Sequence, residues 1–256
     1  MLPKISVQLY SLREQMKDGN HLAILQKLAD AGFAGVELAG FYGMTPKDLR
    51  KAINGMGMEI SSSHTFPCPT PATVSQTIDQ YGDLGIKDLI TGFGPPNFES
   101  LDTIKAASDM LSAVVAPLAR AGITLAIHNH DWEFRRIKGK FVYDYLIDPI
   151  PSLMLEIDTY WAANFGAECP ASIVRAYRNR ASFLHIKDGP ACLPREQNMV
   201  AVGSGALNVP SIIRAADPNV LRWTVIELDR CSTDMLTAVL ESYRYLSSTN
   251  LAYGRK

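Results

Sequence analysis

The chain has 256 residues, of which 47% are hydrophobic and 20% are charged, a composition typical of a folded globular protein without long disordered segments. Its 25 lysines and arginines nearly balance its 26 aspartates and glutamates, so there is no basic excess of the kind that binds nucleic-acid phosphates. Composition and charge therefore argue against a disordered protein and against a nucleic-acid-binding protein.

Short apolar runs rich in β-branched residues alternate along the chain with longer segments of helical spacing, which is the pattern of parallel βα units. Eight runs are predicted to be strands, at residues 5–10, 35–38, 59–64, 88–91, 124–129, 153–158, 182–187 and 223–228. Eight such units in about 250 residues are typical of a closed (β/α)8 barrel, the TIM barrel. We therefore expect one α/β barrel domain that spans residues 1–256.

Capping residues predict where several of the helices between these strands begin and end. Thr45-Pro46 and Thr70-Pro71 predict two helix starts. The first N–H of a helix has no hydrogen-bond partner within the helix, so proline, which lacks this N–H, is tolerated at that position. Asn20 and Ser100 predict two more starts. Helix ends are predicted at glycines that can adopt a left-handed cap, namely Gly32, Gly57 and Gly122.

A doubly wound open sheet is the alternative architecture with the same alternation of elements. It would be favoured by a glycine-rich turn after the first strand, where the backbone approaches a pyrophosphate. The segment QLYSLR at this point contains no glycine. The longest loops, 131–139 and 190–208, follow predicted strands five and seven, at the end of a barrel where catalytic residues lie.

Ionisable side chains stand near the carboxyl ends of six of the predicted strands, and four of the five histidines are among them. In a barrel these ends form one ring, so the side chains converge. Imidazoles and carboxylates gathered there would lose hydration without compensation unless a cation neutralised them. The sequence therefore predicts one bound divalent metal ion. Mixed imidazole and carboxylate ligands suit Mn²⁺, Zn²⁺, Fe²⁺ or Co²⁺ better than Mg²⁺ or Ca²⁺.

Each of these residues also has a purely structural interpretation. His128 and His130 lie two apart on one strand and face the same side, so one could be a ligand while the other orients substrate or supports the ligand. Asp158 alone could cap a helix, and Glu227 alone could pair with an arginine. Together with His185, however, they favour metal ligation.

Residues around this ring are candidates for substrate contacts. Glu37, Glu133 and His64 could either touch substrate or serve as loop charges and strand ends. Lys187 could contact substrate or form an ion pair with Asp188 at the rim. Two aromatic residues are candidate walls of the pocket, because sugars stack on aromatic faces, but both could equally belong to the core: Trp161 and Phe134.

The segments VQLYSL, GVELAG, LAIHNHDWEF, LEIDTYW, FLHIKD and VIELD, in this order, resemble the xylose isomerase-like barrel superfamily of sugar (phosphate) isomerases and epimerases over essentially the whole chain. In that family the ends of strands five to eight supply four metal ligands, usually Glu, Asp, His and Glu. The resemblance places them at His128, Asp158, His185 and Glu227. The HNHDWEF segment is similar to a branch near inosose dehydratases and keto-glycoside lyases.

Histidine at position 128 departs from the usual glutamate of the family. The resemblance implies a mechanism with two bases, in which the glutamates of strands five and eight exchange a proton with a ketose. Because this chain has a histidine on strand five, that mechanism does not transfer intact. The family epimerases also tend to carry a histidine shortly after the strand-six aspartate, where this chain has Thr159-Tyr160-Trp161.

From the residues and the resemblance we expect a metal-dependent sugar or sugar-phosphate isomerase or epimerase of carbohydrate metabolism. It would transfer a proton beside a carbonyl through a metal-stabilised enediolate. Glu227, or His130 supported by Glu133, would be the base. Substrate contacts would come from Glu37, His64, Trp161 and Lys187.

Other functions stay open at this point. The same intermediate could expel a leaving group, which would make the protein a lyase, either a dehydratase or a 3-keto-glycoside eliminase. The alternative outside the enzymes is a barrel that binds a sugar without converting it. An apurinic-site endonuclease is disfavoured, because the chain lacks the extra ligands and the basic surface that DNA requires.

We expect Mn²⁺ as the metal, with Zn²⁺, Co²⁺ or Fe²⁺ as alternatives. The four cysteines are far apart and form no Cys-x-x-Cys pair, so they are expected to be free thiols in a reducing compartment. No export signal and no apolar segment of about 20 residues is present, which favours the cytoplasm and argues against a membrane partner. The expected partner is a small carbohydrate, and a homodimer remains open.

Overall fold

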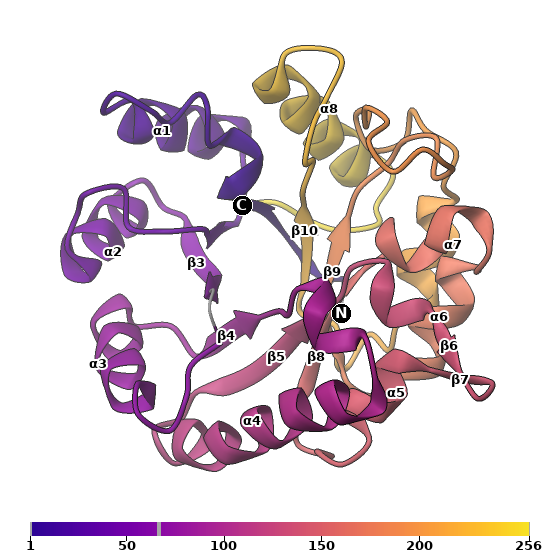
Figure 1. The fold of residues 1–256 in the computed structure, drawn as a ribbon. Coiled ribbons are helices and arrows are strands. Elements are labelled where there is room, and N and C mark those ends of the chain that lie inside the picture. Colours follow the sequence, from indigo (N-terminus) through magenta and orange to yellow (C-terminus); the bar gives the residue numbers. More distant parts are fainter. Residues whose placement is uncertain (1, 66–67, 256) are drawn as a thin grey trace.

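The structure of the chain is a computed structural model, and it describes residues 2–65 and 68–255. Eight parallel strands close into a barrel, and helices surround it (Figure 1). The strands are β1 (Lys4–Gln8), β2 (Gly35–Leu38), β3 (Glu59–Thr65), β4 (Asp88–Thr91), β5 (Thr124–His128), β8 (Met154–Asp158), β9 (Ala181–Ile186) and β10 (Trp223–Ile226). Their order around the ring is β1-β10-β9-β8-β5-β4-β3-β2. The prediction of a (β/α)8 barrel is confirmed, and the open-sheet alternative is wrong.

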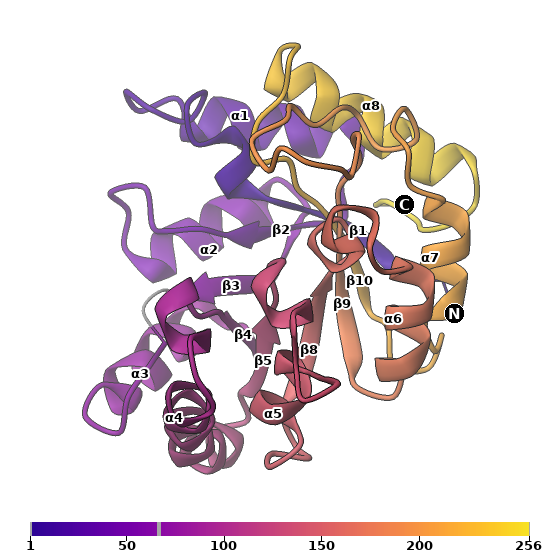
Figure 2. The ribbon, with the colours of Figure 1, turned by 45° about the vertical axis from the view of Figure 1, so that its right-hand side comes forward.

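Helices follow the barrel strands and cover the outside of the ring, as the turned view in Figure 2 also shows. They are α1 (His21–Ala31), α2 (Pro46–Gly55), α3 (Val74–Leu84), α4 (Leu101–Arg120), α5 (Val142–Ile147), α6 (Pro170–Tyr177), α7 (Val209–Ala215) and α8 (Met235–Ser248). None of the helices in the described part of the chain is long and apolar enough to cross a membrane. All four cysteines are free thiols, as the sequence predicts.

The side chains that point into the barrel change from apolar to ionisable along each strand. In β9 the inward positions are Phe183 and His185, followed by Lys187 just beyond the strand, because alternate residues of a strand share a face. In β10 the same alternation runs from Trp223 through Val225 to Glu227. The lower part of the barrel is therefore filled by an apolar cluster, while ionisable groups gather at the upper end.

Most of the predicted helix boundaries agree with the structure. Thr45 accepts a hydrogen bond from the backbone N–H of Asp48, and Ser100 forms a reciprocal capping box with Thr103. Asn20 precedes α1 as predicted but makes no capping hydrogen bond with its side chain. The three glycines predicted to end helices all have positive φ angles, at 101° for Gly32, 78° for Gly57 and 76° for Gly122.

The helix start predicted at Thr70-Pro71 is wrong, because α3 begins at Val74. Thr70 and Thr73 form a turn instead, in which the backbone N–H of Thr73 donates to the carbonyl of Thr70 at 3.0 Å. The hydroxyl of Thr73 accepts from the backbone N–H of Thr70 at 2.9 Å. These local bonds compete with the first helical turn and delay it by one turn.

The loop after β9 is organised by a buried carboxylate. Asp188 accepts hydrogen bonds from the backbone N–H groups of Gly189, Gly203, Gly205 and Leu207 at 2.9 to 3.2 Å. The interpretation of Asp188 as a rim partner of Lys187 is therefore wrong. Its charge is used to hold a long loop beside the mouth of the barrel, where exposed backbone would otherwise be mobile.

The opposite end of the barrel is held by Arg180, which precedes β9. Its guanidinium donates to the carbonyls of Leu153, Ile147 and Ile150 at 2.7 to 3.3 Å. These carbonyls lie at the end of α5 and in the turn that leads to β8, so Arg180 fixes the point where β8 enters the sheet.

We expect Arg180→Ala to lower the free energy of unfolding by about 2–4 kcal/mol, because several buried carbonyls lose a charged donor together. Urea unfolding followed by circular dichroism measures this change. Arg178→Ala removes an exposed arginine two residues away and should change stability by less than about 0.5 kcal/mol. Equal stability of the two variants would contradict the role given to Arg180.

Candidate metal centre

Four ionisable side chains meet at the carboxyl end of the barrel. His128 ends β5, Asp158 ends β8, His185 lies in β9 next to its end, and Glu227 follows β10. One ligand atom from each of the four lies within 4.8 Å of the others, and all four residues are buried. The structure therefore brings together the four residues that the family resemblance gives as metal ligands.

Each imidazole of this cluster turns one nitrogen toward a carboxylate of the cluster. Nδ1 of His185 lies 2.8 Å from Oε2 of Glu227. Nε2 of His128 lies 3.8 Å from Oδ2 of Asp158. These four atoms come from neighbouring strands, since β5 pairs with β8, β8 with β9 and β9 with β10.

His130, the alternative ligand from strand five, lies beside the cluster and outside it. Its ring stacks on Trp132 with ring centroids 4.2 Å apart and meets His128 edge to face at 5.0 Å. Burial lowers the pKa of His130 to about 3, and its Nδ1 has no hydrogen-bond partner among the described residues. The geometry favours His128 as the ligand and leaves His130 as a neutral imidazole at the site.

Two further carboxyl groups lie beneath the imidazoles. Oε2 of Glu156 is 3.0 Å from Nδ1 of His128 and 3.1 Å from Nε2 of His185. Oε1 of Glu37 is also 3.1 Å from Nε2 of His185. Burial and the neighbouring Glu37 raise the pKa of Glu156, whereas His185 overcomes the effect of burial on Glu37 and lowers its pKa to about 2.

A buried ammonium group touches the other side of the cluster. Nζ of Lys187 lies 2.9 Å from Oδ2 of Asp158, 2.9 Å from Oε2 of Glu227 and 3.0 Å from Oδ1 of Asp229. Burial opposes its charge, but these carboxylates outweigh burial and raise the pKa of Lys187 well above its usual value. One ammonium thus faces three carboxylates.

The residues present fit a divalent metal ion. Oδ2 of Asp158 is buried and, within residues 2–65 and 68–255, accepts no hydrogen bond of standard geometry, although it faces Lys187. Burial lowers the pKa of His128 well below its usual value, so its neutral ring keeps a lone pair for a ligand bond. Burial opposes a charge on His185, but Glu156, Glu37 and Glu227 outweigh burial and raise its pKa well above the usual value. A dication held by His128, Asp158, His185 and Glu227 would replace that proton as the positive charge among these carboxylates and would add to the charge of Lys187.

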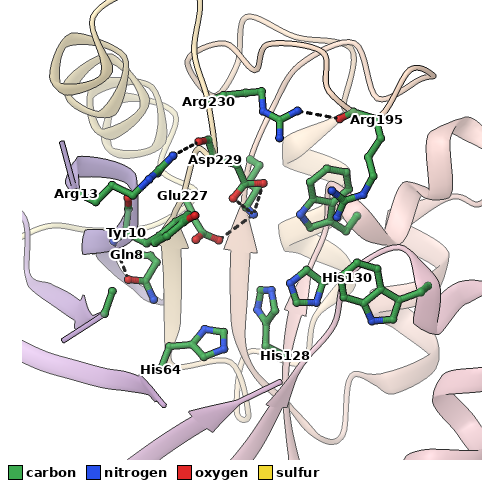
Figure 3. Close-up of a pocket in the computed structure, with 14 residues that line it drawn as sticks. Gln8, Tyr10, Arg13, His64, His128, His130, Arg195, Glu227, Asp229 and Arg230 are labelled. Atoms are coloured by element: carbon green, nitrogen blue, oxygen red, sulfur yellow. Dashed lines mark hydrogen bonds and ion pairs between the residues drawn. The ribbon is translucent and has the colours of Figure 1, made fainter. Parts of the chain in front are cut away.

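A cavity of about 510 Å³ opens directly above this cluster, within the range of roughly 300–1,000 Å³ typical of small-molecule sites. Figure 3 shows His64, His128, His130 and Glu227 at its inner end and Arg13, Arg195 and Arg230 farther out. Three aromatic side chains complete its walls, namely Tyr10, Trp132 and Trp161. Aromatic faces beside polar groups are suited to a polyhydroxylated ligand.

The family to which the chain belongs follows from a family model. The model of the xylose isomerase-like TIM barrel matches residues 25–248. The chain belongs to the xylose isomerase-like TIM barrel family. No protein of curated function matches the chain by sequence.

Solved structures of several members of this barrel fold are similar to the chain. A sugar phosphate isomerase/epimerase from Parabacteroides distasonis is 26% identical with a TM-score of 0.82, and the match covers 98% of this chain and 96% of that one. IolI with a bound zinc atom is 12% identical (TM-score 0.74, coverage 96% and 98%). The probable 3-DHS dehydratase AsbF from Bacillus anthracis is 14% identical (TM-score 0.68, coverage 96% and 98%). At such low identity the last two show a common fold alone.

The other predicted site residues of this barrel divide into those that line the cavity and those that do not. His64, His130, Trp161, Lys187 and Glu227 line the cavity. The remaining three candidates do not line it: Glu37, Glu133 and Phe134.

A physical reason explains why each of these three residues does not line the cavity. Glu37 lies below the imidazoles, is fully buried and contacts His185, so it does not line the cavity. Glu133 accepts the backbone N–H of His130 at 2.8 Å and does not reach its ring. Phe134 packs against Phe141 and Tyr143 in the core, so its interpretation as a pocket wall is wrong.

Sequence reasoning did not identify Glu156, Trp132 or Arg195 as site residues. Glu156 could have been found, because it stands two residues before Asp158 on the same strand and therefore faces the same side. Arg195 lies in the long loop after β9, where its guanidinium packs over the rings of Trp161 and Trp132. No periodicity in the sequence predicts that contact.

We expect the protein to bind one divalent ion per chain, and Asp158→Asn to weaken binding by more than the roughly 10–100-fold typical of residues that only support a ligand. Equilibrium dialysis with Mn²⁺ or Zn²⁺, followed by metal analysis, measures the affinity. Asp88→Asn is the matched control, because Asp88 is also buried but lies at the opposite end of the barrel, paired with Arg222. If the two variants bind metal equally, Asp158 is not a ligand.

Proposed function

We propose that this protein is a divalent-metal-dependent isomerase or epimerase that acts on a sugar or sugar phosphate by moving a proton next to a carbonyl group. The observation that carries the proposal is that one sugar-sized cavity is lined by His128 and Glu227 of the metal cluster and also by His130, whose buried Nδ1 has no hydrogen-bond partner in the described part of the chain. The similar sugar phosphate isomerase/epimerase structure supports the reaction class.

A metal ion held by His128, Asp158, His185 and Glu227 would supply Lewis acidity, which stabilises negative charge on a substrate oxygen when a neighbouring C–H bond loses its proton. The chain itself must then take up that proton. Of the two predicted bases, Glu227 is the poorer, because its Oε2 already contacts His185 and Lys187. Burial alone would raise the pKa of Glu227, but these two neighbours lower it.

His130 is the better placed base. Its ring lines the cavity, it is neutral, and the stack on Trp132 holds its orientation. Negative charge that develops on a nearby substrate would raise the pKa of His130 and so favour proton uptake. Glu133 contributes by fixing the backbone of His130.

Wild type and His130→Ala, both loaded with Mn²⁺, should be incubated in deuterated water with a panel of ketoses, inososes and 3-keto-glycosides. We expect wild type to incorporate deuterium beside the carbonyl of one of these sugars and to form its isomer or epimer. The variant should be slower by about 10²- to 10⁴-fold with unchanged metal content, because only the proton acceptor is lost. Mass spectrometry and NMR of the sugars measure both effects.

Two results would contradict this proposal. Release of water or of an aglycone would instead support a lyase, which is the second candidate because histidine at position 128 removes the carboxylate that a two-base epimerase uses on strand five. Metal binding without deuterium exchange into any sugar would support a barrel that only binds carbohydrate.

A further inference from the structure

Each imidazole of the metal centre has one nitrogen that points away from the cluster, and this nitrogen faces a buried glutamate. Oε2 of Glu156 lies 3.0 Å from Nδ1 of His128. Oε1 of Glu37 is hydrogen-bonded to Nε2 of His185 at 3.1 Å, and Oε2 of Glu156 lies at the same distance from that nitrogen. All four side chains are at most 3% exposed, so water cannot replace these partners.

Glu37 is held by side-chain hydrogen bonds, and Glu156 is placed by the pairing of its strand. Glu37 accepts hydrogen bonds from the amide of Gln8 at 2.5 Å and from the hydroxyl of Ser62 at 2.6 Å. Glu156 is fixed by strand register, because it is the direct partner of His128 in the pairing of β5 with β8. The glutamates are therefore part of the barrel framework.

A neutral imidazole carries a proton on one nitrogen and a lone pair on the other, and only the lone pair can bind a metal. A carboxylate that accepts from Nδ1 of His128 leaves the lone pair on Nε2, the nitrogen that faces Asp158. Nδ1 of His185 lies 2.8 Å from Oε2 of Glu227, and a metal bound there would take the place of its proton. A carboxylate that accepts from Nε2 of His185 then leaves the lone pair on Nδ1. Both lone pairs then point at the same centre.

We propose that Glu156 and Glu37 are positioning residues that hold His128 and His185 in opposite tautomers, so that the metal binds Nε2 of the first and Nδ1 of the second. This inference rests on the metal centre of the proposed function. It also gives a reason for histidine at position 128, because a glutamate there would lie directly opposite Glu156 in the neighbouring strand and repel it.

The most direct test is a long-range ¹H–¹⁵N NMR correlation on wild-type protein labelled at its histidines and loaded with Zn²⁺. We expect zinc on Nε2 of His128 with a proton on Nδ1, and the reverse arrangement in His185. Zinc bound to the same type of nitrogen in both rings, or to Nδ1 of His128, would overturn the inference while leaving the metal centre intact. Failure of wild type to bind Zn²⁺ would overturn the proposed function itself.

Zinc affinity of variants gives a second test. We expect Glu156→Gln and Glu37→Gln each to weaken Zn²⁺ binding by about 10–100-fold, because the amide can donate to the ring and favour the wrong tautomer. Glu133→Gln is the matched control, since Glu133 is equally buried but accepts the backbone N–H of His130 and, among the described residues, forms no hydrogen bond with His128 or His185. Its Zn²⁺ affinity should stay within about threefold of wild type, well inside the effect expected for a supporting residue. Equal losses in all three variants would show a general effect of replacing a buried carboxyl group and would contradict the inference.

The coupling between positions 128 and 156 can be tested by replacing His128 alone and then His128 together with Glu156. His128→Glu alone should bind Zn²⁺ more weakly than the double variant His128→Glu with Glu156→Gln, because the second change removes the opposing carboxylate. Equal affinity of the single and the double variant would show that the two positions are not coupled.

Discussion

Carboxyl groups buried side by side repel one another and lose their hydration, and this constraint governs the upper end of the barrel. Asp158, Glu227 and Asp229 surround the ammonium of Lys187, which supplies one positive charge. Such an arrangement is costly unless further positive charge is present. A bound cation would link the acidic ring, the imidazoles of His128 and His185 and the cavity above them.

The apolar core of the closed barrel offsets the destabilising effect of this concentration of charge. Its lower part is filled by apolar side chains such as Phe183 and Trp223, which bury enough surface to offset unfavourable electrostatics elsewhere. Parallel strands in fixed register then deliver His128, Asp158 and His185 to adjacent positions. The loop that Asp188 organises lies beside the same mouth. Apolar packing at one end and the candidate metal site at the other end are thus built on one set of strands.

The fold was predicted from strong local signals in the sequence, whereas the choice of the four candidate ligands came from the family resemblance, and the structure brings these four residues together. Apolar β-branched runs locate the strands, and a polar residue at the end of such a run has few structural explanations. The start of α3 was missed because side-chain bonds of Thr73 compete with helix formation. Glu156 and Glu37 were not recognised as supports of the imidazoles, because that role depends on distances between strands that no single segment of sequence reveals. The role of Asp188 depends in the same way on a loop that folds back over 15 to 19 residues.

The central claim is that a metal ion sits among His128, Asp158, His185 and Glu227. Anomalous X-ray diffraction from crystals grown with Zn²⁺ tests it most directly. The account predicts one strong peak about 2.0–2.2 Å from a nitrogen or oxygen atom of each of these four residues. The absence of a peak there, with Lys187 still bridging Asp158 and Glu227, would show that the lysine alone neutralises the site and would contradict the account.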